Sequence, residues 1–344
     1  MIGGGQAGLA AGYHLRQAGL QFVILEAAED AGGSWRRYYD SLALFSPAEY
    51  SSLPGMPFPG DPDHYPRRDE VIAYLRDYAA AFALPIVTGA RVTAVRREKP
   101  GFRVVTEAQG SFRGLNVIAA TGSFGNPYIP DLPGASEYRG RILHSFAYRN
   151  PEGFAGQRIV VVGGANSAVQ IAVELARAAR VTLATRSAII FVPQRILGHD
   201  GHFWLKVTGL DNVSWLKDQS TPVVDVGKYC RAIAAGRPDR RRMFQRLTAT
   251  GVAWNESEQE DVDTILLATG FRPALGYLSE LGALDESGRP RQQDGVSTVV
   301  PGLYYVGLSG QRNFASATIR GVGPDAAIVV SHLRKANRQA PPPG

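Results

Sequence analysis

Short apolar runs alternate along this chain with glycine-rich turns and with segments in which apolar residues recur at helical spacing. The runs at 21–26, 91–97, 102–106, 115–120, 158–162 and 181–186 have the length and content of strands. Segments 7–17, 69–81 and 167–179 have the spacing of helices, and Gly19 ends the first of them. Strands that alternate with helices predict an α/β protein with parallel sheets.

One unit of this pattern occurs twice. Gly3, Gly5 and Gly8 fit G-x-G-x-x-G between the start of the chain and a predicted helix, and the segment 163–168 repeats that arrangement. Glu26 and Arg186 follow the first residue of their units at the same offset, each at the end of the next strand. A glycine turn that leads into a helix offers free N–H groups and a partial positive charge to a pyrophosphate. The repeat therefore predicts two Rossmann-like dinucleotide-binding domains.

The charge at the end of each second strand indicates which dinucleotide each unit holds. Glu26 can accept hydrogen bonds from a ribose diol and would repel a 2′-phosphate, which favours FAD or NAD. A guanidinium at Arg186 can bind a 2′-phosphate, which favours NADPH. Ala165 replaces the middle glycine of the second unit, so we expect looser binding there. A vestigial second site and an ordinary surface role for Arg186 are the alternatives.

Composition narrows the class of protein. The 344 residues suffice for two domains, and 44% hydrophobic and 20% charged residues are an ordinary balance. The net charge of +6 comes without a basic stripe that would indicate nucleic acid, and we expect the Arg240-Arg241-Arg242 run to be a solvated loop. With Cys230 as the single cysteine, a flavin-to-disulfide relay is excluded. No run could span a bilayer and no signal peptide is evident, so we expect a cytoplasmic protein without membrane contact.

The order of the units predicts how the domains share the chain. Residues 1–145 and 255–335 should form a discontinuous FAD-binding domain, residues 146–254 an inserted NADPH-binding domain, and residues 336–344 a flexible tail, with fraying from His332. The segment 46–66, rich in Pro and Gly, should be a long ordered loop. Only two residues precede Gly3, which implies either a stunted central strand or a chain that begins upstream. We interpret the motif 199–202 as a polar loop rather than a metal site.

Several motifs together resemble the class B flavin-dependent monooxygenases, the flavin-containing monooxygenases and their Baeyer–Villiger relatives, particularly the short bacterial single-chain type. Besides the two glycine motifs, Gly32 to Trp35 is similar to that family's second flavin contact. The residues Tyr138, Gly140, His144 and Tyr148 are similar to its F-x-G-x-x-x-H-x-x-x-Y/F signature, with Tyr in place of the first Phe. The stretch from Tyr305 to Thr318 is similar to its flavin-ring segment.

The resemblance implies FAD and NADPH as cofactors, a small-molecule substrate and dioxygen as partners, and a homodimer as one option. NADPH would reduce FAD, and the reduced flavin would form a C4a-hydroperoxyflavin that oxygenates a soft nucleophile or a ketone. Ser46 stands where many members have an asparagine near the reactive flavin carbon, and it is the candidate catalytic residue. His144 would be a structural hydrogen-bonder. The cofactor-binding candidates are Gly3, Gly5, Gln6, Ala7, Gly8, Glu26, Gly33, Ser34, Trp35, Thr121, Gly122, Gly163, Gly164, Asn166, Ser167, Ala168, Arg186, Ser187, Thr269, Gly270, Gly307 and Thr318.

Two other functions stay open at this point. One is an NAD(P)H-dependent flavin reductase or oxidase that transfers no oxygen to a substrate. The other is a nucleotide-binding protein that has lost its activity. Flavin colour and NADPH consumption distinguish the inactive nucleotide-binding protein from the monooxygenase and from the reductase or oxidase. An oxygenated product distinguishes the monooxygenase from the reductase or oxidase.

Overall fold

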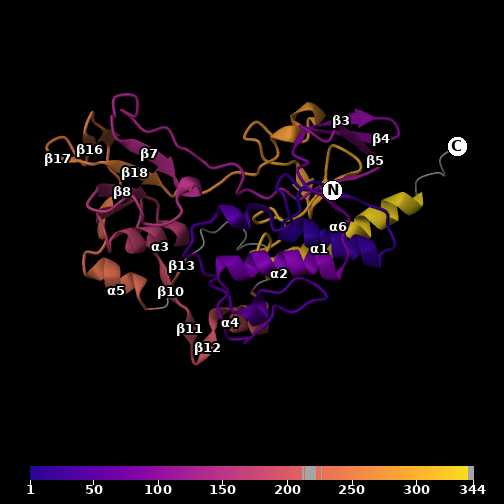
Figure 1. Cartoon of the computed structure of the whole chain (residues 1–344), viewed down its shortest axis with the longest axis horizontal. Helices are drawn as coiled ribbons and strands as arrows, with labels where there is room; N and C mark the ends of the chain where they lie inside the picture. Colours follow the sequence, from indigo (N-terminus) through magenta and orange to yellow (C-terminus); the bar gives the residue numbers. More distant parts are fainter. Residues whose placement is uncertain (211–212, 214–221, 226, 340–344) are drawn as a thin grey trace.

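The computed structural model describes residues 1–210, 213, 222–225 and 227–339. The chain forms two lobes, each built around a parallel sheet (Figure 1). One lobe contains α1, α2 and α6, and the other contains α3 and α5. The alternating pattern of the sequence is confirmed as an α/β fold with two Rossmann-type sheets.

The lobe that carries the second glycine motif has a five-stranded parallel sheet in the order β14-β9-β8-β18-β7. Helix α3 covers one face, and a small antiparallel sheet covers the other through Leu247, Val252 and Trp254. The strands of the main sheet are β7 (Arg141–His144), β8 (Arg158–Val162), β9 (Arg180–Thr185), β14 (Asp239–Arg242) and β18 (Thr264–Leu267); the covering elements are α3 (Asn166–Leu175), β15 (Arg246–Leu247), β16 (Gly251–Ala253) and β17 (Gln259–Asp261).

The lobe that carries the first glycine motif has an equivalent sheet with a very short centre. Ile2 alone bridges β6 on one side and β1 on the other, both in parallel. The order is β2-β1-Ile2-β6-β21, continued by two antiparallel strands. The strands are β1 (Ile24–Leu25), β2 (Ile86–Val87), β6 (Val117–Ala119), β21 (Leu303–Tyr305), β20 (Val296–Ser297) and β19 (Gln292–Gln293). The strand expected at 21–26 is only two residues long, at Ile24–Leu25, and Ile2 pairs between it and β6.

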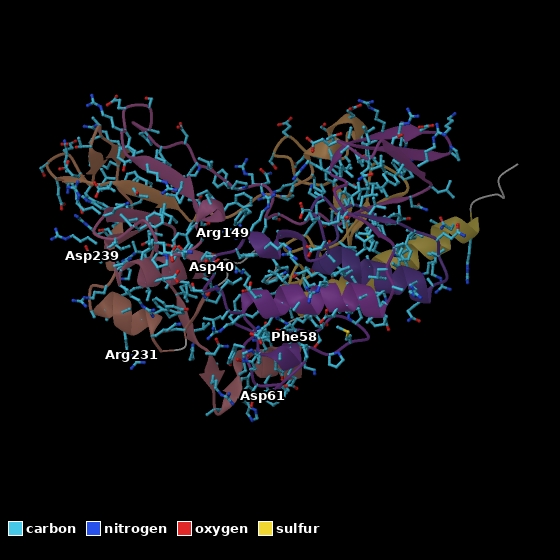
Figure 2. All side chains as sticks on the ribbon, viewed as in Figure 1. Asp40, Phe58, Asp61, Arg149, Arg231 and Asp239 are labelled. Carbon is cyan, nitrogen blue, oxygen red and sulfur yellow. The ribbon has the colours of Figure 1, made fainter. Side chains whose placement is uncertain are left out.

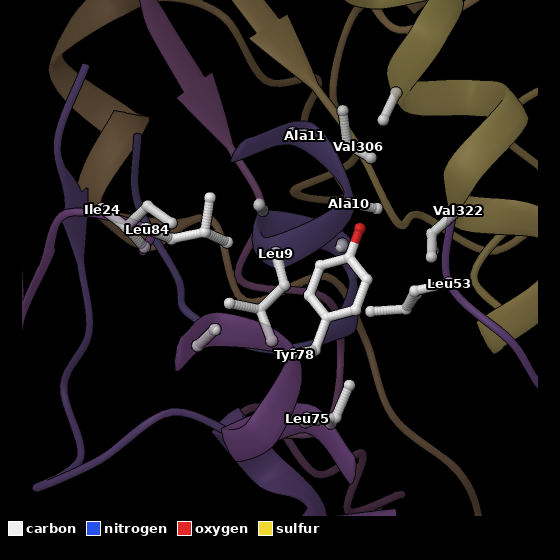
Figure 3. Close-up of a cluster of buried hydrophobic side chains, with 14 of the residues drawn as sticks. Leu9, Ala10, Ala11, Ile24, Leu53, Leu75, Tyr78, Leu84, Val306 and Val322 are labelled. Carbon is white, nitrogen blue, oxygen red and sulfur yellow. The ribbon is translucent and has the colours of Figure 1, made fainter. Parts of the chain in front are cut away.

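Helices α1 (Gln6–Gln17), α2 (Arg68–Ala81) and α6 (Ile319–Gln339) pack together beside this sheet. Figure 3 shows the contact, with the Tyr78 ring of α2 between Leu9 of α1 and Val322 of α6. The other face carries an antiparallel meander of β3 (Val92–Glu98), β4 (Gly101–Thr106) and β5 (Ser111–Gly114), packed with the 3-10 helix Gly276–Leu281. In both sheets the strand that leads into the glycine loop lies in the centre. The strand after the first helix (β1 or β9) is on one side of it, and the Ala-Thr-Gly strand (β6 or β18) is on the other.

The structure corrects several expectations about element limits. The second sheet takes β7 and β18 from outside the expected range 146–254, because strand patterns do not reveal which sheet a strand joins. Helix α6 continues to Gln339 with Leu333 buried, so residues 332–339 are helical where the sequence predicted fraying; 340–344 lie outside the described residues. Helix α3 ends at Leu175 rather than at 179. The arginine run 240–242 is not a loop but edge strand β14.

The long segment between α1 and α2 is ordered, as expected. Tyr74 and Tyr78 of α2 donate their hydroxyls to the carbonyl oxygens of Met56 (2.7 Å) and Pro54 (2.6 Å). Phe58 is buried against Tyr74. Short 3-10 turns lie at Gly33–Arg37 and Ala48–Tyr50.

An insertion between β9 and β14 reaches from the second lobe across to this segment, with α4 (Gly201–Thr208) lying below α2 in Figure 1. Its other elements are β10 (Phe191–Pro193), β11 (Arg195–Ile196), β12 (His199–Asp200), β13 (Val223–Asp225) and α5 (Tyr229–Ala234). Within the described residues, no helix has the length and apolar character needed to cross a membrane.

Polar contacts join the lobes where the chain passes from one to the other. Asp40 and Arg149 lie at this junction (Figure 2), and the Asp40 N–H donates to the Arg149 carbonyl at 2.7 Å. The Arg149 guanidinium donates to the Tyr38 carbonyl at 2.8 Å, and Asn150 donates to the Asp40 carboxylate at 2.9 Å. Tyr39 then enters the core beside α3 and hydrogen-bonds Gln170.

Candidate nucleotide-binding sites

The first glycine loop has glycines where the backbone approaches itself. Gly3 has φ +103°, and a Cβ there would lie 2.6 Å from the carbonyl oxygen of Ala120. A Cβ on Gly8 would overlap the Gly3 carbonyl oxygen. Gly33, with φ +54°, would place a Cβ 2.8 Å from the Gly5 Cα. Only glycine fits these positions, so the loop and the 3-10 turn can lie side by side at the start of α1.

The N-terminus of α1 is free to receive an anion. Gly5 precedes the helix without a capping side chain, and its first turn contains no acidic residue. Its first N–H groups therefore lack side-chain acceptors, which is the arrangement that binds a pyrophosphate. Gln6 connects three segments, because its Nε2 donates to the Ala317 carbonyl at 2.6 Å and its Oε1 accepts from Trp35 Nε1 at 3.0 Å.

The segment before α6 completes this side of the site. Gly307 packs against Ala7, since a Cβ on Gly307 would lie 2.5 Å from the Ala7 Cβ. The Thr318 hydroxyl caps α6 by accepting from the Gly321 N–H at 3.1 Å. Ala7 itself is buried, so it serves the site through its small size and its backbone.

Glu26 is bound to the glycine loop, a role that its sequence position did not indicate. Its carboxylate is buried and accepts the N–H of Gly4 at 2.5 Å and of Ala28 at 2.8 Å. Each carboxylate oxygen keeps a second lone pair, which is what a ribose diol would require. Glu26 can therefore hold the loop and a ribose together.

The second glycine loop repeats this geometry. Gly163 has φ +144°, and a Cβ there would overlap the carbonyl oxygen of Ala268. The Gly163 N–H donates to Ala184 of β9 at 3.0 Å. Ala168 is fully buried beside Gly163, so its contribution is again its small size. Ala165 is exposed at the start of α3, where no side chain caps the helix.

Three other residues predicted to contact this nucleotide have different structural roles. Asn166 donates to the Pro222 carbonyl and accepts the Val224 N–H, both at 3.1 Å, so its amide fastens β13. A Cβ on Gly164 would meet open space, with no atom closer than 3.9 Å. Arg186 is exposed directly after β9 and has no partner among the described residues.

The two strand ends with the sequence Ala-Thr-Gly cross between the lobes. The Thr121 hydroxyl donates to the Ala274 carbonyl at 2.9 Å, and the Thr269 hydroxyl donates to the Tyr128 carbonyl at 2.5 Å. Gly122 and Gly270 have φ values of +60° and +84°. Each threonine therefore hydrogen-bonds the crossing segment that follows the other strand. The alanine before each threonine, Ala120 or Ala268, packs against the glycine loop of its own lobe.

The signature residues at 138–148 hold the edge of the second sheet. Tyr138 donates to the Val262 carbonyl at 2.8 Å, and Tyr148 donates to Glu174 of α3 at 2.8 Å. His144 Nδ1 accepts the Phe146 N–H at 3.1 Å, so the proton is on Nε2, which donates to the Gly270 carbonyl at 3.0 Å. Burial lowers the pKa of His144, in keeping with this neutral form. These contacts are structural, in the way expected for His144.

A small pocket, partly open to solvent, is lined by residues of both lobes. The predicted contacts Ser34 and Ser167 both line it, together with Arg37, whose guanidinium lies 5.3 Å from the centre of the Phe146 ring. The remaining lining is mainly aromatic: Tyr38, Tyr39, Phe124 and Phe271, with Ser145. Ser46 is not part of this lining, and its hydroxyl is hydrogen-bonded to that of Ser51 at 2.8 Å.

Sequence reasoning missed a buried polar cluster at the motif 199–202. Asp200 accepts from Tyr65 and from Gln194, both at 2.6 Å, and from His202 Nδ1 at 2.7 Å. Burial alone would raise the pKa of Asp200, but these hydrogen bonds outweigh it and lower the pKa to about 2. Because Tyr65 belongs to the lobe of the first glycine motif, the cluster joins the insertion to that lobe. The described residues contain no group of three His, Cys, Asp or Glu placed to hold a metal ion.

The family model for the pyridine nucleotide-disulphide oxidoreductases matches residues 1–307. The chain belongs to this family. Within it, the chain is 36% identical over 341 residues to a CzcO-like oxidoreductase of Geobacillus kaustophilus, covering 97% of both chains. A solved flavin-containing monooxygenase from Stenotrophomonas maltophilia shares 34% identity with a TM-score of 0.88, over 98% of this chain and 97% of that one. An indole-3-pyruvate monooxygenase from Oryza sativa is 29% identical, covering 97% of this chain and 90% of that protein.

These relationships confirm the predicted resemblance, the fold of two Rossmann-type domains, and an enzyme of the flavin-dependent monooxygenase group that uses FAD and NADPH. This member of a family named for disulphides has one cysteine, the exposed Cys230. Its sequence therefore cannot form an internal redox disulfide, and its electrons need another acceptor.

Proposed function

We propose that this chain is an NADPH-dependent flavoprotein monooxygenase that adds one oxygen atom from dioxygen to a small soft nucleophile or a ketone. One observation carries the proposal: two glycine loops of the same geometry end in opposite charges, Glu26 at one and Arg186 at the other. An acid suits the ribose of FAD, and a base suits the 2′-phosphate of NADPH. The chain can thus hold an electron donor and an electron acceptor on facing lobes.

The chain's own residues bind, orient and shield. The α1 N-terminus would bind the FAD pyrophosphate, and the α3 N-terminus would bind that of NADPH. Gln6 and Trp35 would fix the loop beside the flavin through their mutual hydrogen bond. The pocket that Ser34 and Ser167 share is where the two reactive rings would approach each other. Its aromatic walls would keep water away from the reacting atoms.

The reaction balances with two electrons from NADPH. One oxygen atom of dioxygen enters the substrate, the other leaves as water, and NADPH and a proton become NADP⁺. The flavin supplies the electron transfer to dioxygen and the activation of the transferred oxygen atom. Thioethers, amines and ketones are the substrate classes to test, and the rice relative's name adds indole-3-pyruvate to the ketones.

A reductase or oxidase that gives only hydrogen peroxide is the second candidate. The Ser46 position favours it, because one hydroxyl already bonded to Ser51 stands where the resemblance leads us to expect an amide. A reaction under ¹⁸O₂ separates the two functions. The monooxygenase gives one labelled oxygen atom in the product for each NADPH coupled to it. Peroxide as the sole product over the whole substrate panel would leave only the oxidase.

A further inference from the structure

Edge strand β14 places its arginines at the predicted 2′-phosphate site. It runs parallel to β9, with Arg240 opposite Leu183 and Arg242 opposite Thr185, the residue before Arg186. The Met243 N–H donates to the Thr185 carbonyl at 2.9 Å, so the two strand ends stay paired to the last residue of β9. The end of β14 therefore lies beside the start of the Arg186 turn.

The three arginines of the strand face two ways. Leu183 packs in the core on the α3 side of the sheet, and paired residues of neighbouring strands share a face. Arg240 and Arg242 are thus on the side of α3, whose N-terminus follows the second glycine loop. Arg241 is on the other side, where it lies 4.2 Å from the centre of the Trp254 ring and pairs with Glu258.

Arg240 holds the turn that carries Arg186. Its Nε donates to the Thr185 hydroxyl at 3.0 Å, and its NH2 group donates to the Ser187 carbonyl at 2.8 Å. These two bonds span Arg186 on both sides. The turn is thereby fixed before any ligand arrives, and the N–H groups on NH1 of Arg240 stay free for an acceptor.

Within the part of the chain that the structure describes, no ion pair balances the charges of Arg186 and Arg242 at this corner. Arg186 and Arg242 are exposed, and neither has a hydrogen bond or an ion pair with any described residue. Arg241, by contrast, has two glutamates within reach. Three guanidinium groups around one turn repel one another when no described carboxylate pairs with them, and an anion with several oxygens would relieve that repulsion.

We propose that Arg240 is a positioning residue for Arg186 and that Arg242 is a further cation for the 2′-phosphate of NADPH, so that β14 sets the preference for NADPH over NADH. This inference rests on the proposed NADPH site and extends it to a second strand. A phosphate monoester fits because the corner adjoins the glycine loop that would hold the pyrophosphate of the same molecule. Arg186 alone would be a mobile surface side chain, whereas the braced turn presents it in one place.

The test uses nucleotide fragments, so it needs neither the flavin nor turnover. Binding of 2′,5′-ADP and of 5′-AMP is measured by calorimetry on the wild type and on single variants. We expect Arg240→Ala and Arg242→Ala each to weaken 2′,5′-ADP about tenfold or more while 5′-AMP changes little, since a charged hydrogen bond is lost. Arg241→Ala, on the same strand but facing away, is the matched control and should keep the wild-type ratio. Arg240→Lys should restore only part of it, because a lysine cannot make both bonds.

The outcomes separate the inference from the function on which it rests. Equal binding of the two nucleotides by the wild type would contradict the NADPH site itself. A ratio that falls in Arg186→Ala but is unchanged in both Arg240→Ala and Arg242→Ala would overturn the inference alone. Equal weakening of both nucleotides in Arg240→Ala would show a loss of folding rather than of recognition. In that case the exposed Arg242, whose removal breaks no contact within the described structure, decides the question.

Discussion

Gly163 lies against the carbonyl oxygen of Ala268 so closely that no side chain fits between them. Gly3 and Ala120 have the same relationship in the other lobe. In both lobes, the strand ending in Ala-Thr-Gly therefore fixes the floor of the glycine loop. The crossing segments that follow connect the lobes, so each nucleotide loop is mechanically joined to the passage between them.

The first prediction follows from this contact. Gly163→Ala should destabilise the protein by about 1–3 kcal/mol, because a Cβ would overlap a carbonyl and the φ of +144° is unfavourable for alanine. NADP⁺ binding should weaken with it. Gly164→Ala is the control, since that position has space. Thermal unfolding and NADP⁺ titration of both variants check this, and equal stabilities would contradict the geometry.

Glu26→Gln should weaken FAD binding and also lower the stability of the apoprotein. A glutamine places an NH₂ group against either the Gly4 N–H or the Ala28 N–H, so one buried donor loses its acceptor at a cost of about 1–3 kcal/mol. The FAD content after dialysis and the unfolding midpoint without flavin are the measurements. The exposed neighbour Glu29→Gln should change neither. A variant that loses FAD at unchanged apoprotein stability would limit Glu26 to ribose binding.

Arg186→Ala should raise the dissociation constant of NADPH and leave that of NADH unchanged. The loss should be about 1–3 kcal/mol, the range for hydrogen bonds to a charged group. Ala165→Gly should tighten both cofactors alike, because the methyl group would lie near the pyrophosphate that they share. Titrations with each cofactor test both statements. Equal losses for NADPH and NADH in the first variant would give Arg186 a role in the fold instead.

The cluster around Asp200 should make stability depend on acid. The pKa of Asp200 is lowered to about 2 in the folded protein, against about 3.9 in an unfolded chain. Its contribution is therefore complete above the unfolded value and is lost as pH falls through about 4 toward 2. Urea unfolding across that range should show a steeper decline for the wild type than for Asp200→Asn. The exposed Asp131→Asn should follow the wild type.

Ser46→Asn should reduce the share of NADPH that ends as hydrogen peroxide. The asparagine amide offers a donor and an acceptor, whereas the native Ser46 hydroxyl is hydrogen-bonded to Ser51. Peroxide and oxygenated product are quantified per NADPH with a thioether substrate. Ser51→Ala, which frees the Ser46 hydroxyl and also removes the Ser51 bonds to the carbonyls of Ser46 and Pro47, is the comparison. An unchanged peroxide share in Ser46→Asn would place the reaction away from this loop.

The parts of this architecture that the sequence predicted are those with a local cause. Gly3, Gly8 and Gly163 belong to strand–turn–helix units, so their spacing identified them, although the backbone that Gly3 and Gly163 approach belongs to distant strands. Arg240 escaped notice because its role depends on β14 pairing with β9, more than fifty residues earlier in the chain. The partners of Asp200 and Glu26 are likewise set by tertiary packing, which local patterns do not contain.

Which strand joins which sheet depends on tertiary pairing in the same way. A run such as Thr264–Leu267 reads as a buried strand in any sheet, and only its pairing with β8 assigns it to the second lobe. The tail was misjudged because its polar residues conceal Leu333, whose burial keeps α6 in contact with the core. Composition detects solvation, whereas one well-placed apolar residue can decide whether a helix continues.

The backbone bonds of Ile2 place the centre of its sheet directly below the flavin site, so flavin binding bears on the stability of this lobe. The Ile2 N–H donates to the Ile118 carbonyl at 2.9 Å and its carbonyl accepts from the Ala120 N–H at 2.8 Å, while Met1 and Gly3 exchange backbone bonds with Leu25 at 2.8 Å, so this segment joins both of its neighbours directly below the glycine loop. A ligand that binds only the folded form adds its own binding free energy to stability. Vitamin supply should then set abundance: in riboflavin-starved cells, chains without flavin would open more often and be degraded, and the enzyme would disappear before its transcript does.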